Sequence, residues 1–151
     1  MRVLDIRRGD SVQRIVTYLT EAEVERLRGL PPEGVIGVLH ERQTLQVNAV
    51  FREFLHAAIA QCAPRDPAMR ELAAVQGDGR MVYVDSRVPE SIQPVPEEDV
   101  LGWFLVRAGH IVEGSYLPNP GHRMQGTHGL SAAIAAMRPA MAAELLRRET
   151  S

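Results

Sequence analysis

The sequence predicts an α+β fold, with a mainly antiparallel sheet of about five or six strands and about four or five helices packed on one side. Two observations support this class. Strand-like and helix-like segments both occur, and the strands connect through hairpins or helices. No internal repeat, low-complexity run or linker appears. With 151 residues and 45% hydrophobic residues, the chain can bury one core, so we expect a single globular domain over residues 1–151.

The first expected element is a β-hairpin. Residues 2–7 alternate weakly between apolar and polar side chains, and Gly9-Asp10 favours a tight turn. The following segment, 12–18, contains the β-branched and aromatic run from Ile15 to Tyr18, which favours a strand. Its apolar side chains also recur at helical spacing. We therefore predict a strand over 12–18, with a helix as the alternative.

Helix boundaries are marked by capping residues. Thr20 and Glu23 form a capping box, and Asn48 caps an amphipathic helix that continues to Cys62. Asp66-Pro67 begins another helix, and a helical tail follows Ser131. Pro139 either kinks this tail or opens a second piece. The remaining expected strands are residues 35–39, 81–84, and the two arms of a hairpin, 99–107 and 111–117, joined across Ala108-Gly109.

Composition excludes several functional classes. A net charge of −2 disfavours nucleic-acid binding, which usually requires a basic excess. All 17 basic residues are arginine, so no lysine can form a Schiff base or a phosphate loop, and this usage is typical of a GC-rich bacterial genome. Cys62 is alone, which excludes an intramolecular disulfide. The charged start and the lack of a long apolar run predict a cytoplasmic protein with no membrane segment.

The residues that could carry chemistry gather in a long Pro- and Gly-rich loop, residues 118–129. It contains His122 and His128, either of which could act as a general base. Asp85 is the carboxylate best placed to orient such a base, because it follows a strand at the end of the sheet where loops meet. The base would act on Ser115, Thr127 or water.

The same region suggests two further kinds of site, one for a metal ion and one for an anion. The spacing of His110, His122 and His128 matches no known metal signature, so we expect neither a metal nor a cofactor. The run Glu97-Glu98-Asp99 offers hard oxygen ligands for a metal ion. It also fits the charged residues that commonly flank an apolar strand and keep it from aggregating. Arginine suits anion binding, and the candidate ligand-binding residues are Arg123, Ser115 and Tyr116.

A third feature is the apolar strand 100–106, which is apolar on both faces. Its Trp103, with Leu101 and Leu105, would form an interface if exposed. The leading hypothesis is therefore a non-catalytic bacterial accessory or interaction domain that binds a protein partner or small ligand, with a homodimer as one form. The alternative is a small hydrolase-like enzyme that uses His122 and His128 with Asp85.

Overall fold

The computed structural model describes residues 1–150, which group into two compact units. Unit 1 comprises Met1–Ala58 and Ile134–Ser151, and unit 2 comprises Ile59–Ala133. The boundary between Ala58 and Ile59 falls within a helix. The single-domain organisation expected from chain length stays a prediction.

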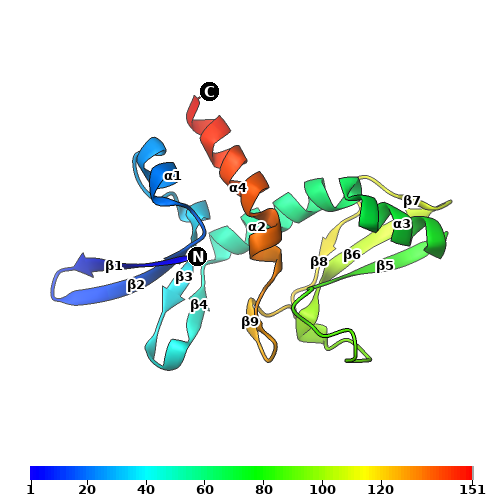
Figure 1. The fold of residues 1–151 in the computed structure, drawn as a ribbon, viewed down its shortest axis with the longest axis horizontal. Coiled ribbons are helices and arrows are strands. Elements are labelled where there is room, and N and C mark those ends of the chain that lie inside the picture. Colours follow the sequence, from blue (N-terminus) through cyan, green and yellow to red (C-terminus); the bar gives the residue numbers. More distant parts are fainter. Residues whose placement is uncertain (151) are drawn as a thin grey trace. The chain divides into compact units, whose positions relative to one another are not determined.

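Unit 1 is built on a four-stranded antiparallel sheet of order β1-β2-β3-β4 (Figure 1). The β1–β2 hairpin turns at Gly9-Asp10, where Gly9 has a φ of +62° that few other residues adopt readily. Residues 12–18 thus belong to a strand and its end, not to a helix, because β2 pairs with both β1 and β3. The strands are β1 Arg2–Arg8, β2 Ser11–Thr17, β3 Val35–Leu39 and β4 Leu45–Val47.

The unit 1 helices begin as their capping residues predict. In α1, the Thr20 side chain accepts the Glu23 N–H while the Glu23 carboxylate accepts the Thr20 N–H. The Asn48 side chain accepts the Val50 N–H at the start of α2. Pro139 lies inside one continuous helix, α4. The elements are α1 Glu21–Arg26, η1 Pro32–Gly34, η2 Glu41–Gln43, α2 Ala49–Cys62 and α4 Ala133–Thr150.

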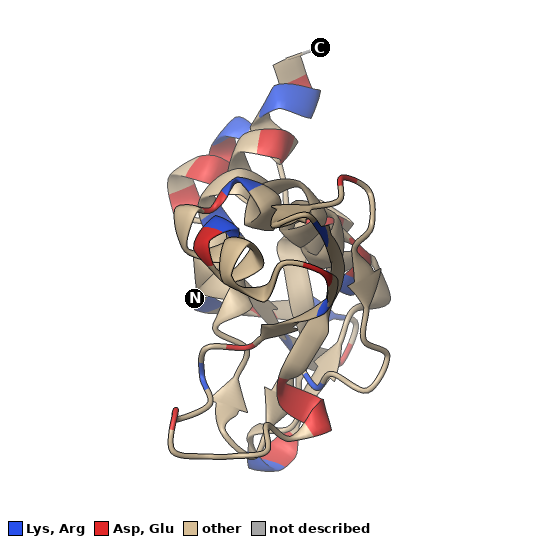
Figure 2. Ribbon diagram, turned by 90° about the vertical axis from the view of Figure 1, so that its right-hand side faces the viewer, with Lys and Arg blue, Asp and Glu red and all other residues tan. Residues whose placement is uncertain are grey.

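The unit 1 core is almost wholly apolar. Phe51 and Leu55 of α2 are fully buried, and the Phe51 ring contacts Tyr18 with 5.6 Å between ring centroids. The apolar side chains of α4 add Met141 and Leu145 to this core. The charged residues of α4 gather toward its C-terminal end instead (Figure 2). The hydrophobic effect therefore accounts for most of what holds unit 1 together.

Unit 2 contains a second antiparallel sheet, with the order β5-β6-β7 and with β8 also paired to β6. Helix α3 lies along this sheet (Figure 1). Met81, Phe104 and Val106 point to the buried side of the sheet. A separate two-stranded sheet joins β9 and β10. The elements are η3 Ala63–Arg65, α3 Pro67–Gln76, β5 Gly79–Val84, η4 Glu97–Asp99, β6 Val100–Arg107, β7 His110–Ile111, β8 Leu117–Pro118, β9 Gln125–Gly126 and β10 Gly129–Leu130.

The predicted α+β class with antiparallel sheets is confirmed. Two details differ from expectation. The strands in the described part of the chain divide among three sheets rather than forming one. The second arm of the predicted hairpin is broken into β7 and β8, because the chain turns between them through Glu113-Gly114. Among residues 1–150, no helix is both long and apolar enough to cross a lipid bilayer.

Candidate functional site

Two buried aspartates meet at one end of the β5–β6 pair. The antiparallel register pairs Val84 with Val100, so the residue after β5 lies beside the residue before β6. The Asp85 N–H donates to the Asp99 carbonyl oxygen at 2.7 Å, and both side chains are 0% exposed. Two buried carboxylates so close together would destabilise the fold unless cations or hydrogen-bond donors compensate for them.

Arg87 supplies this compensation. Its Nε donates to Asp99 Oδ1 at 2.7 Å and lies 3.8 Å from Asp85 Oδ2, and its side chain is only 4% exposed. The two terminal nitrogens donate to main-chain carbonyls of the surrounding loops, at Glu98, Arg123, Met124 and Gly129. A guanidinium group has five N–H donors, and five acceptors surround this one. Arg87 therefore both neutralises the aspartates and holds the loop 118–129 in place.

His122 comes from that loop and contacts the first aspartate. Its Nε2 lies 3.0 Å from Asp85 Oδ2, and the same oxygen accepts the Ser131 hydroxyl at 2.5 Å. The other oxygen, Oδ1, accepts the Ala132 N–H at 2.9 Å. Burial by itself raises the pKa of Asp85, but these hydrogen bonds and the Arg87 charge outweigh burial and hold that pKa below its usual value. Asp85 is therefore ionised at neutral pH.

His128 contacts the second aspartate instead. It lies in the turn between β9 and β10, with its Nδ1 3.2 Å from Asp99 Oδ2 and its side chain 24% exposed. Glu98 adjoins this pair and accepts the Thr127 N–H at 3.0 Å. That hydrogen bond is the main reason that the pKa of Glu98 is lowered. The structure thus brings Glu98, Asp99 and His128 together.

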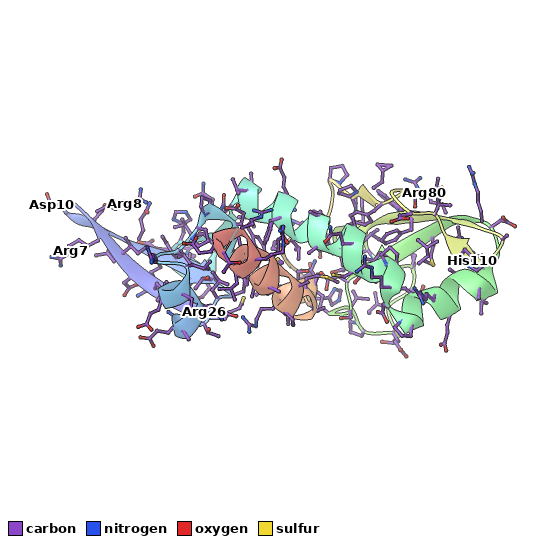
Figure 3. All side chains as sticks on the ribbon, turned by 90° about the horizontal axis from the view of Figure 1, so that it is seen from above. Arg7, Arg8, Asp10, Arg26, Arg80 and His110 are labelled. Carbon is purple, nitrogen blue, oxygen red and sulfur yellow. The ribbon has the colours of Figure 1, made fainter. Side chains whose placement is uncertain are left out.

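The other candidate residues have different surroundings. Ser115 Oγ donates to the Val112 carbonyl and accepts the Leu105 N–H, which completes the turn before β8. The Tyr116 hydroxyl donates to the Leu101 carbonyl, and burial raises the pKa of Tyr116. Arg123 is 71% exposed. His110 lies at the surface of unit 2 (Figure 3).

Three site residues were missed by sequence reasoning. Arg87 and Ser131 bond the aspartates directly, and Asn119 holds the loop by donating to the carbonyls of Glu97 and Val100. Asn119 stands in an Asn-Pro-Gly turn, a signal that could have marked it as an ordered loop residue. Nothing in the sequence distinguishes Arg87 from the other arginines.

The outer face of the unit 2 sheet is apolar. Val82, Trp103 and Leu117 are neighbours across three strands, and Leu105 follows Trp103 on the same face of β6. Val82, Leu105 and Leu117 are 45%, 43% and 56% exposed, and Trp103 is half-buried. The Arg80 guanidinium lies 4.4 Å from the Trp103 ring centroid. We call these four apolar residues the outer sheet face.

Leu101 is not part of the outer sheet face, although it has the same strand parity as Trp103. It is only 1% exposed. The Asn119 N–H and the Tyr116 hydroxyl both donate to the Leu101 carbonyl. The predicted interface residues are therefore separated, with Trp103 and Leu105 facing outward and Leu101 in the core.

Only candidate side chains that are exposed to solvent can meet a ligand or partner. His122 and Asp85 have no exposed side-chain surface, so in this conformation they orient one another and the loop rather than meeting a ligand. The groups that solvent reaches include the outer sheet face, Arg123, His128 and part of the Glu98 side chain. Comparison with protein-family models, curated proteins and solved structures finds no match.

Proposed function

We propose that this chain is a non-catalytic interaction domain that associates with a second copy of itself through the outer sheet face. The observation that carries the proposal is the row of exposed apolar side chains across β5, β6 and β8, centred on Trp103. Isolated exposed apolar residues are normal on a protein surface, but a contiguous group with an aromatic centre is typical of a binding surface.

The arrangement of charges favours a second copy as the occupant. Arg80 pairs with Leu105 from the β5 side. On the other side, the Val112 N–H donates to the Leu105 carbonyl, and Glu113 is the residue that follows Val112. Arg80 and Glu113 are both exposed. A twofold axis parallel to β6 would place Arg80 of one copy opposite Glu113 of the other, twice in the same interface. Two sheets stacked in this way would bury both apolar faces with their strands aligned.

The four side chains alone would bury less than the roughly 800 Å² per partner of a standard interface. The surrounding residues of β6 and β7 must therefore contribute, and we expect an affinity in the micromolar range, about −8 kcal/mol. Such a dimer dissociates at dilutions that can be reached in the laboratory.

The test is sedimentation velocity of the full chain over a concentration series that spans this range. Leu105→Glu places a charge in the apolar centre and is expected to give a monomer at every concentration. The matched control is Val75→Glu, because Val75 is 88% exposed on α3 of the same unit and lies outside the outer sheet face. The control is expected to dimerise like the wild type.

A charge exchange tests the twofold arrangement. Arg80→Glu and Glu113→Arg should each weaken the dimer, and the double variant should recover most of the loss. Trp103 is the only tryptophan, so its emission should also shift to the blue as the concentration rises. A wild-type chain that stays monomeric at about 100 μM would refute the proposal, as would a Leu105→Glu variant that still dimerises.

The hydrolase-like alternative has one observation in its favour, the 3.0 Å approach of His122 to Asp85. Two observations weigh against it. Neither side chain is accessible, and the Ser131 hydroxyl donates to Asp85 rather than to the imidazole that would have to activate it. The pair is better explained as part of the support for the loop.

A further inference from the structure

We propose that Glu98, Asp99 and His128 form a binding site for a divalent transition-metal ion of the zinc class. One donor atom from each residue lies within 4.8 Å of the others. One imidazole nitrogen and two carboxylate oxygens are a ligand set that such ions accept, with water in the remaining position. The imidazole favours zinc, cobalt or nickel over magnesium and calcium, which prefer oxygen ligands alone.

The carboxylates are held by donors outside the three residues. Arg87 Nε donates to Asp99 Oδ1 at 2.7 Å, which leaves Oδ2 facing the His128 ring at 3.2 Å. The Thr127 N–H donates to Glu98 Oε1 at 3.0 Å, and Glu98 Oε2 lies 3.8 Å from the exposed Arg123 guanidinium. Outer hydrogen bonds of this kind fix the direction of metal ligands and are a regular part of metal sites. Each carboxylate is therefore oriented by a donor that is not itself one of the three ligands.

The three proposed ligands differ in how far their side chains are exposed to solvent. The Asp99 side chain is 0% exposed, the Glu98 side chain 19% and the His128 side chain 24%. The ligands also come from two separate segments, η4 and the turn between β9 and β10, so an ion would link them. An ion could enter from the exposed side and keep one or more waters there.

The charge balance also favours a cation. Three carboxylates, those of Asp85, Glu98 and Asp99, face the two guanidinium groups of Arg87 and Arg123. Arg123 is 3.8 Å from Glu98 Oε2 and 71% exposed, so it can turn away into solvent at little cost.

The test uses the full chain after removal of metals with a chelator. Titration with zinc chloride in a calorimeter is expected to show one ion per chain, and cobalt(II) should give visible absorption bands that report its ligands. His128→Gln and Glu98→Gln each remove a direct ligand, so each should reduce the zinc affinity by at least the roughly 10–100-fold that loss of an outer hydrogen-bond partner costs. His110→Gln is the matched control, because His110 is an exposed histidine of the same unit, and its affinity should equal that of the wild type.

Thermal unfolding provides a second measurement. Zinc should raise the Tm of the wild type and of His110→Gln, because an ion that binds only the folded state stabilises it. At the same zinc concentration it should raise the Tm of His128→Gln by less. Asp99 is not substituted, because losing this buried partner of Arg87 could unfold the site for other reasons. Absence of zinc binding at about 100 μM, or equal binding by His128→Gln and wild type, would overturn the proposal.

Discussion

Each of the two units of this molecule is stabilised internally by a different kind of interaction. In unit 1 the core is apolar, with Phe51, Leu55 and Ile36 fully buried. In unit 2 an apolar core of Phe104 and Met81 adjoins a buried polar network around Arg87. Of the buried polar residues in the described chain, unit 1 has Thr17 and His56, and unit 2 has Asp85, Asp99, Asn119, His122 and Ser131.

The contrast shows why a fold needs such a network at all. Apolar packing is non-directional, so it stabilises a core without fixing a loop in one conformation. A hydrogen bond has a preferred distance and angle, and a buried donor without its acceptor is costly. The long loop 118–129 has little apolar surface of its own apart from Met124, and the network supplies the directional contacts that position it.

The largest effect should come from Arg87→Lys. A lysine ammonium has three donors on one atom and cannot reach the five acceptors that the guanidinium serves. We expect the free energy of unfolding of unit 2 to fall by about 3 kcal/mol or more, because buried groups lose their partner. Denaturant unfolding followed by Trp103 fluorescence measures this change. Arg107→Lys, at an exposed arginine of the same unit, should change it by less than about 0.5 kcal/mol, and equal losses for both variants would contradict the role of the network.

The next largest effect should come from acid, which is expected to lower the stability of unit 2. The pKa of Asp85 is lower in the folded state than in the unfolded chain, so its contribution to stability is present above its ordinary pKa of about 3.9 and is lost as the pH falls through the folded value. Unfolding followed by Trp103 fluorescence should therefore show unit 2 weakening below about pH 4.

The variant Asp85→Asn should be less stable than wild type at neutral pH and should lose less on acidification. Asp10→Asn, at the exposed tip of the β1–β2 hairpin (Figure 3), should keep the wild-type slope. An unchanged slope in Asp85→Asn would show that the acid sensitivity arises elsewhere.

The smallest effect is expected in unit 1. Thr20→Ala removes one half of the capping box of α1 and should cost about 1 kcal/mol. Thr20→Ser keeps the hydroxyl and should recover most of that loss. Amide hydrogen exchange in α1 measures both variants. If Thr20→Ser is as damaging as Thr20→Ala, the methyl group rather than the hydrogen bond is responsible.

How far the sequence predicts this structure depends on the range of each interaction. The caps at Thr20, Asn48 and Asp66 act over two or three residues, and each begins a helix as predicted. The hairpin turn at Gly9 is equally local. The strand-end position of Asp85 also follows from local signals, since it comes directly after Met81-Val82-Tyr83-Val84.

The partners of Asp85 could not be predicted in the same way. His122 is 37 residues away and Ser131 is 46 residues away, and no local pattern encodes either distance. The burial of Leu101 was missed because strand alternation places it on the same face as Trp103, yet it is only 1% exposed. Long-range contacts decide the site, whereas short-range signals decide the elements.

The bonds of Arg87 also bear on the order in which unit 2 folds. Its acceptors at Arg123 and Gly129 lie 36 and 42 residues further along the chain. Contacts across such separations form after local ones, because the entropy of closing the intervening chain is lost before the contact is gained. We therefore expect the β5–β6 pair to form first and the segment from Asn119 to Ser131 to join it last. In the native protein the same segment should open as one cooperative piece, with all of its amides exchanging together.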